Sequence, residues 1–205
     1  DMSDLVIGID ASTTAVKAIA FDRHGRELFQ ARRAYPLANP HPGHFEQDAE
    51  HWWTALLEAL AEVAGSVGGS RIAALAIAHQ RETFTLIDRT GMPLIPAILW
   101  LDERARKQVA RLSSELGRDA IRTWSGKPPD PTPAIYAVAW LAEHRPEALR
   151  AASTLVDTHA FLAHRLTGRL ATSTASADPL GLLSTATGQW HETLVGAAGL
   201  KMAQL

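Results

Sequence analysis

The segment DLVIGIDASTTAVKAIAFD, residues 4–22, places oxygen-bearing side chains directly after a short apolar run. A carboxylate where a strand meets a turn can hold a hydrated Mg²⁺, while turn hydroxyls, backbone N–H groups and a nearby ammonium group can bind phosphate oxygens. The pattern therefore suggests a phosphate site with its metal. A polar hairpin turn with a capping aspartate is the alternative, and the G-x-x-x-x-G-K-[ST] string of a P-loop is absent. The candidate residues are Asp10, Ser12, Thr13, Thr14 and Lys17.

A second group, HQRET, follows the apolar run RIAALAIAH, which we predict to be a buried strand. Polar side chains that emerge at such a strand end usually face the ligand crevice of an open α/β sheet. Arg81 and Glu82, with Gln80 beside them, supply the donors and acceptors that a polyhydroxylated substrate needs. The alternative is a surface ion pair.

A third group, WLDER, lies where an apolar strand meets a helix. Trp100 offers a flat apolar face of the kind that sugars pack against, and Asp102 can accept hydrogen bonds from hydroxyl groups. Equally, Trp100 can be a core residue and Asp102 the N-cap of the helix that follows.

Composition restricts the partners. The 205 residues carry a formal net charge of −2, so no global positive field attracts nucleic acid or anionic lipid. No run approaches the roughly 18 apolar residues that span a bilayer. Without cysteine there are no disulfides or cysteine-ligated metals, and a cytoplasmic location is expected. The histidines lack zinc-site spacing, and no G-x-S-x-G nucleophile elbow is present, so the expected partner is a small molecule.

The elements that must position these groups can be read from periodicity and turn residues. We predict three antiparallel strands over Leu5–Asp10, Ala15–Asp22 and Glu27–Tyr35, then a proline-rich surface loop. A helix capped by Asp48 runs to about Gly65. Further along the chain we predict strands in TFTLID, PLIPAILW and STLVD, and helices over Asp102–Leu116, Ala134–Glu143 and THAFLAHRLTG, the last stopped by Gly168.

This order predicts an α/β fold of the ribonuclease-H-like, actin-like ATPase type, with a mixed sheet flanked by helices. The strings IGIDASTTAVKAIAFD, FEQDAEHWW, IAHQRETFTLIDRTGMPLIPAILWLDERA, AWLAEHRPE and HAFLAHRLTGRLATSTASA, in this order, resemble the amino-terminal domain of the FGGY family of carbohydrate kinases. The resemblance covers nearly the whole chain.

The resemblance implies an ATP-dependent sugar or polyol kinase, a cytoplasmic phosphotransferase that uses MgATP as phosphoryl donor, with a homodimer as a family expectation. Asp10 would serve the metal and the transferring phosphate, and the turn residues Ser12, Thr13 and Thr14, with Lys17, would bind phosphate. The residues that would contact the sugar are Gln80, Arg81, Glu82, Trp100 and Asp102. Phosphoryl transfer depends mainly on positioning and charge neutralisation, which such residues supply.

The acceptor stays open, because HQRET is closest to glycerol kinases and WLDER to xylulokinases, and because Thr132 stands where glycerol kinases tend to have an aromatic residue. In the family, the general-base aspartate and the adenosine site lie in later segments. We therefore expect residues 1–205 to form an amino-terminal substrate-binding domain, incomplete at its carboxyl end and inactive without the second, nucleotide-binding domain. Asp178, in SADPLG, does not match the general-base context.

Two other functions are considered. A non-catalytic actin-like module that binds a nucleotide or a partner would not need a sugar pocket, so saturation binding with sugars separates it from a kinase. A Mg²⁺-dependent nuclease or phosphatase would need clustered carboxylates for two metals, and the sequence indicates none beside Asp10. The kinase hypothesis also requires Asp10 and the Arg81–Glu82 pair to line a common pocket.

Overall fold

The computed structural model describes residues 4–205, which divide into two compact units. The first unit comprises residues 4–37 and 48–80, and the second comprises residues 38–47 and 81–205. Each unit has its own sheet of four strands. Within residues 4–205, no helix combines the length and the hydrophobicity that crossing a membrane requires.

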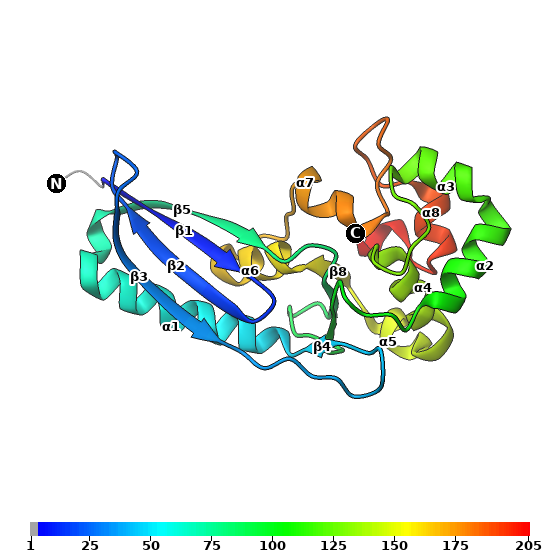
Figure 1. Ribbon diagram of the computed structural model, residues 1–205, viewed down its shortest axis with the longest axis horizontal. Helices are drawn as coiled ribbons and strands as arrows, with labels where there is room; N and C mark the ends of the chain where they lie inside the picture. The colour runs from blue at the N-terminus through cyan, green and yellow to red at the C-terminus, as the bar shows by residue number, and fades with distance from the viewer. Residues whose placement is uncertain (1–3) are drawn as a thin grey trace. The chain divides into compact units, whose positions relative to one another are not determined.

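The sheet of the first unit has the strand order β3-β2-β1-β5 (Figure 1). Its strands are β1 (Leu5–Ala11), β2 (Ala15–Phe21), β3 (Glu27–Ala34) and β5 (Ile72–His79). The first three pair antiparallel, as the sequence predicted, whereas β5 is parallel to β1, so the sheet is mixed.

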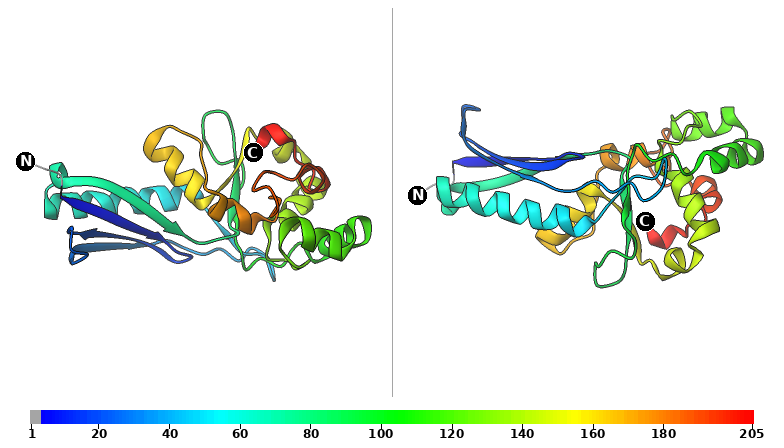
Figure 2. Two further views of the ribbon diagram at one scale, coloured as in Figure 1. Left: turned by 90° about the horizontal axis from the view of Figure 1, so that it is seen from above. Right: turned by 60° about the horizontal axis from the view of Figure 1, so that its bottom comes forward.

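Helix α1 (Ala49–Val67) runs along one face of this sheet (Figures 1 and 2). The predicted cap is confirmed, because the Asp48 carboxylate accepts the Glu50 N–H at 2.9 Å. Trp52, Leu56 and Val63 are buried along one side of the helix, as its 3.6-residue period requires. A 3₁₀ turn (Gly69–Arg71) leads from the helix into β5.

The prediction that Ile72–His79 is buried is wrong, although the strand itself is present. Most of β5 is exposed, and Leu75 keeps 41% of its surface in contact with solvent. The physical reason is position: β5 is at the end of the strand order, and α1 packs against β2 and β3. An apolar run therefore identified a strand but not its environment.

The second unit holds an antiparallel sheet in the order β4-β7-β6-β8. Its short strands are β4 (Glu46–Gln47), β6 (Phe84–Ile87), β7 (Ala97–Ile98) and β8 (Thr154–Asp157). The strand predicted in PLIPAILW thus shrinks to two residues, and the proline-rich loop, exposed over most of its length as expected, ends in β4.

Helix α4 (Ala134–His144) belongs to the second unit's core, and its first six residues are all buried. Helices α2 (Arg106–Leu116) and α6 (Thr158–Thr167) match predicted helices, and Gly168 ends α6 in a left-handed conformation as expected. Sequence periodicity did not predict the shorter helices α3 (Arg118–Ser125), α5 (Pro146–Ala151), α7 (Thr174–Ala177) and α8 (Glu192–Ala197), or the 3₁₀ turns Asp178–Leu180 and Met202–Gln204.

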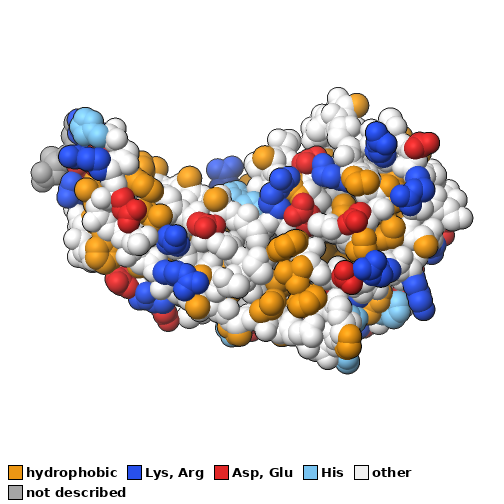
Figure 3. Space-filling model, in the orientation of Figure 1, with side chains coloured by type: hydrophobic (Ala, Val, Ile, Leu, Met, Phe, Trp, Pro, Cys, Tyr) orange, Lys and Arg blue, Asp and Glu red, His pale blue; other side chains and the backbone are white. Residues whose placement is uncertain are grey.

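The expected class, a mixed sheet flanked by helices, is confirmed by the first unit. On the face shown in Figure 3, basic and acidic side chains are interspersed, which agrees with the small net charge of the chain.

Candidate functional site

Asp10 lies near the end of β1 with its side chain exposed. In the antiparallel pairing with β2, Asp10 stands opposite Lys17. Residues directly opposite in such a pair share one face of the sheet, so a carboxylate and an ammonium group flank the turn that follows. Within residues 4–205, no hydrogen bond or ion pair occupies either charged group. Both remain available to a ligand.

The turn between β1 and β2 is held by Tyr35, a residue that sequence analysis did not select. The Tyr35 hydroxyl donates to the carbonyl oxygens of Ser12 and Ala15, the latter at 3.0 Å. The Tyr35 N–H donates to the Thr14 carbonyl at 3.2 Å. The Ser12 N–H donates to Ala15 O at 3.0 Å, which closes the turn. These bonds fix the backbone that carries the predicted phosphate-binding hydroxyls.

The pKa of Tyr35 is raised, first because the phenol is buried and second because the negative charge of Asp10 lies nearby. Tyr35 therefore stays a neutral donor near neutral pH. A single carboxylate beside hydroxyl groups is an all-oxygen donor set, the kind that Mg²⁺ prefers when water and phosphate oxygens complete its shell. The residues present fit a hydrated Mg²⁺ bound through Asp10.

Gln80 belongs to the same end of the first unit's sheet. Its N–H donates to the Ala11 carbonyl at 2.9 Å, one residue beyond Asp10, and the residue is buried. The structure thus brings Asp10, Lys17 and Gln80 together. Arg81 and Glu82 belong to the second unit, and a pocket common to both groups stays a prediction.

Glu82 has an unusual backbone. Its φ of 58° lies in the left-handed region, and no other non-glycine residue among those described has a positive φ. This conformation is costly for a residue with a Cβ, and such strain clusters at functional positions. Burial raises the pKa of Glu82, and the negative charge of Asp178 also raises it, whereas the charges of Arg81 and Lys127 lower it. Glu82 is thus surrounded by charged groups.

Asp178 joins this group in the structure, although no sequence motif pointed to it. Its Oδ2 lies 2.7 Å from Lys127 Nζ and 3.8 Å from Arg81 Nη2. Lys127 was likewise missed, because Lys127 and Asp178 both lie far from Arg81 in the chain. Arg81 does form an ion pair, as the alternative in the sequence analysis held, but its partner is Asp178 and not the neighbouring Glu82.

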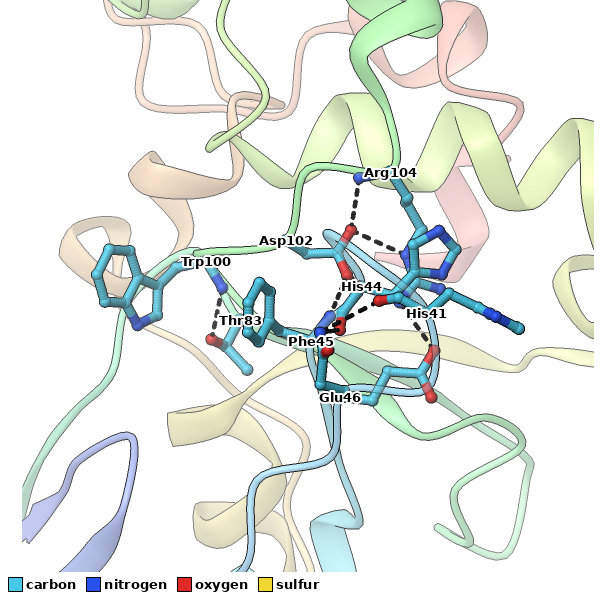
Figure 4. Close-up of polar contacts among 9 residues, drawn as sticks. His41, His44, Phe45, Glu46, Thr83, Trp100, Asp102 and Arg104 are labelled. Carbon is cyan, nitrogen blue, oxygen red and sulfur yellow. Dashed lines mark hydrogen bonds and ion pairs between the residues drawn. The ribbon is translucent and has the colours of Figure 1, made fainter.

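Trp100 keeps 44% of its surface exposed, so the indole can offer a face to a ligand. Its backbone N–H donates to the Thr83 hydroxyl at 3.3 Å, and Thr83 is fully buried (Figure 4). The contact ties the segment after β7 to the start of β6 and so fixes the base of the Trp100 side chain.

Asp102 is buried and fully engaged (Figure 4). Its two carboxylate oxygens accept from Arg104 Nε at 2.9 Å and Nη2 at 2.8 Å, and Oδ2 also accepts the Phe45 N–H at 2.6 Å. Arg104 also donates to Glu46 Oε1 at 2.8 Å. That Asp102 binds a sugar stays a prediction. Its hydrogen bonds support a structural role, in which it holds the segment around Arg104 against the loop that contains Phe45.

The alternative that Asp102 caps the next helix is wrong, since α2 begins at Arg106 with Ala105 at the cap position. The Asp102 carboxylate is instead held by Arg104 and by the Phe45 N–H. Contacts with Arg104 and with the distant Phe45 backbone therefore engage the Asp102 carboxylate in place of a helix cap.

A hollow of about 330 Å³ lies beside this network, between the loop of residues 38–47 and α4. The Arg104 guanidinium lies 5.0 Å from the centroid of the Trp140 ring, and His44 meets the same ring edge to face. The pKa of His44 is lowered, first by burial and then by the positive charge of Arg104. His44 is therefore neutral at pH 7.

The model of the FGGY family of carbohydrate kinases, N-terminal domain, matches residues 5–205. Among curated proteins, xylulose kinase of Streptomyces rubiginosus is 34% identical over 98% of this chain and 41% of its own length. Glycerol kinase of Gluconobacter oxydans is 35% identical over 94% of this chain and 39% of its own length. The chain therefore spans about two fifths of these relatives.

Solved structures agree in fold. Gluconate kinase from Lactobacillus acidophilus superposes with a TM-score of 0.93 at 27% identity, covering 98% of this chain and 41% of that one. Xylulose kinase from Rhodospirillum rubrum gives a TM-score of 0.93 at 26% identity, covering 98% and 42%. The actin-like fold predicted from the sequence is thereby confirmed.

Proposed function

Since the chain belongs to the FGGY family of carbohydrate kinases, we propose that it forms the amino-terminal part of an enzyme that transfers the γ-phosphoryl group of ATP to a hydroxyl of a sugar or polyol. The observation that carries the proposal is the Asp10 carboxylate at the end of β1, opposite Lys17 and beside a turn of three hydroxyl residues. Phosphoryl transfer needs positioning and charge neutralisation, and these groups supply both.

In this proposal Asp10 holds Mg²⁺, which neutralises charge on the phosphates when it is bound. Lys17 and the turn N–H groups bind phosphate oxygens, and the hydroxyls of Ser12, Thr13 and Thr14 add further donors. Tyr35 keeps the turn in one conformation, so these donors are preorganised.

The acceptor side of the proposal rests on the second unit. Arg81 donates to hydroxyl groups and Glu82 accepts from them, while the half-exposed Trp100 packs against the apolar face of the sugar. Gln80 is a further proposed acceptor-binding residue, and it belongs to the first unit. Asp102 acts through Arg104 by holding the segment that follows Trp100.

The remaining parts of the proposal rest on the family resemblance. The general base and the adenosine site are expected in the parts of the relatives that this chain does not match, so residues 1–205 alone should not turn over. A cytoplasmic location agrees with the absence of cysteine. A homodimer is expected from the family alone.

The test is a coupled ADP-release assay on the complete protein that contains this chain, with a panel of polyols and ketoses. We expect MgATP-dependent turnover with at least one acceptor and none from residues 1–205 alone. If the complete protein hydrolyses or binds ATP without phosphorylating any acceptor, the non-catalytic or hydrolytic alternatives replace the proposal.

A further inference from the structure

The Asp178 carboxylate is shared by two cations from distant parts of the second unit. Lys127 Nζ lies 2.7 Å from Asp178 Oδ2, and Arg81 Nη2 lies 3.8 Å from the same oxygen. The Asp178 side chain is 37% exposed and that of Lys127 24% exposed. Both heads are therefore partly withdrawn from water and still reachable by a ligand.

The loop that carries Lys127 is held by a close backbone approach at Gly126 and by hydrogen bonds of Ser125. Gly126 has a φ of +69°, and a Cβ there would lie 2.7 Å from Thr185 Cγ2, so the backbone approaches its neighbour too closely for another residue. The Lys127 N–H donates to the Ser125 hydroxyl at 3.1 Å, and that hydroxyl donates to the Ile121 carbonyl at 2.8 Å. These contacts fix the backbone from which the Lys127 side chain extends toward Asp178.

The segment that carries Asp178 is fixed as well. Asp178 begins a 3₁₀ turn directly after α7, and the Gly181 N–H donates to its carbonyl at 3.2 Å. The Ser173 hydroxyl caps α7 by accepting the Ser176 N–H at 3.1 Å. The pair is also less exposed than a typical surface ion pair, so solvent screens it less.

Four charged groups meet here, and their formal charges cancel: Arg81 and Lys127 against Glu82 and Asp178. Within the described residues, Asp178 Oδ1 takes part in no hydrogen bond. A hydroxyl group both donates and accepts, so it can satisfy a carboxylate oxygen and a nearby ammonium or guanidinium together. A substrate carboxylate in the place of that hydroxyl would gain no net attraction from the neutral cluster, could donate no hydrogen bond to Asp178 Oδ1 and would be repelled by its charge.

We propose that Asp178, held in place by Lys127, selects the acceptor of the proposed kinase by binding a hydroxyl of a neutral polyhydroxylated substrate and disfavouring sugar acids. Asp178 is the substrate-binding residue, and Lys127 is a positioning residue that acts through it. This inference rests on the proposed function and adds the substrate class.

The test uses steady-state kinetics of the complete protein with MgATP and two acceptor types, neutral xylitol and D-xylulose and the acid D-xylonate. We expect Asp178→Asn to raise KM for the neutral acceptors by about 10- to 100-fold, the range for losing a hydrogen bond to a charged group. KM for ATP should not change, and the ratio of kcat/KM for the acid to that for xylitol should rise. Asp178→Ser should act in the same direction.

Lys127→Met should raise the same KM more weakly, and Lys127→Arg should restore it, because an arginine can hold the carboxylate. The matched controls are Asp119→Asn and Lys107→Met, which change equal charges on α3 and α2 and should leave every constant unaltered. Thermal unfolding confirms that each variant is folded.

The outcomes separate two failures. If the wild-type protein phosphorylates no acceptor, the proposed function fails and this inference fails with it. If the wild type is active and folded Asp178→Asn keeps its KM and its preference for neutral acceptors, the inference alone is overturned. A uniform fall in kcat with unchanged KM would also overturn it, because that pattern indicates a purely structural role.

Discussion

Asp102 and Arg104 form a two-point ion pair, with Nε 2.9 Å from Oδ1 and Nη2 2.8 Å from Oδ2. Both side chains are almost entirely buried, at 2% and 4% exposure. The pKa of Arg104 is raised: burial alone would lower it, and the hydrogen bonds to Asp102 and Glu46 outweigh that effect. Removing one partner leaves a buried charge without compensation, which is the costly case.

We therefore expect Asp102→Asn to lower the free energy of unfolding by about 3 to 5 kcal/mol. The control is Glu103→Gln, which breaks the exposed pair with Arg106 and should cost less than about 1 kcal/mol. Urea denaturation of residues 1–205 measures both. Equal effects of the two substitutions would show that the buried pair does not stabilise the fold.

Asp10→Asn should separate activity from stability. The side chain is exposed and makes no hydrogen bond or ion pair within residues 4–205, so the unfolding free energy should change by less than about 0.5 kcal/mol. If Asp10 binds the metal as proposed, loss of its charge should lower kcat of the complete protein by at least about 100-fold. Asp22→Asn, at the far end of β2, is the control and should keep kcat. Full activity of Asp10→Asn would remove Asp10 from the mechanism.

Tyr35→Phe removes the hydroxyl that donates to Ser12 and Ala15 carbonyl oxygens. Loss of this hydroxyl should cost about 1 kcal/mol of stability and loosen the turn between β1 and β2. If this turn binds phosphate as proposed, KM for ATP should rise while KM for the acceptor stays constant. Tyr136→Phe, in the core of the second unit, is the matched control and should leave KM for ATP unchanged. An equal rise in both KM values in Tyr35→Phe would contradict a local effect on the turn.

Glu82 should make stability fall with rising pH. Its pKa is raised above the usual value of 4.5, mainly by burial, so the folded state binds the proton more tightly than the unfolded state. The resulting stabilisation is complete below about pH 4.5 and is lost as the pH rises through the raised pKa. Relative to wild type, Glu82→Gln should therefore gain stability as the pH rises above about 4.5, and thermal melts at a series of pH values measure the gain. A constant difference would refute the shift.

The backbone of Glu82 gives an independent prediction. At a φ of 58°, replacing the glutamate with glycine relieves steric strain in the folded state. This gain roughly offsets the stability that is lost because glycine has greater conformational freedom in the unfolded chain. Glu82→Gly should thus remain within about 0.5 kcal/mol of wild type, while acceptor phosphorylation is lost. Arg81→Gly, where φ is not positive, should cost about 0.5 to 1 kcal/mol. Equal losses of stability in the two variants would argue against strain at Glu82.

Local patterns predicted the elements whose signals are local. The first strand, the Asp48 cap of α1 and the Gly168 stop of α6 all depend on a few neighbouring residues, and all three predictions are confirmed. Short helices such as α3 and α5 were missed because one or two turns give too little periodicity to recognise.

The sequence by itself determined that Asp10, three hydroxyl residues and Lys17 gather at one turn, since all of them lie within eight positions of the chain. Only the tertiary structure decided that Asp178 meets Lys127, that Tyr35 closes the turn and that Asp102 turns inward to Arg104. It also decided that β5 is exposed. The physical reason is that charge pairing and burial depend on which distant segments pack together, and a local pattern carries no record of that packing.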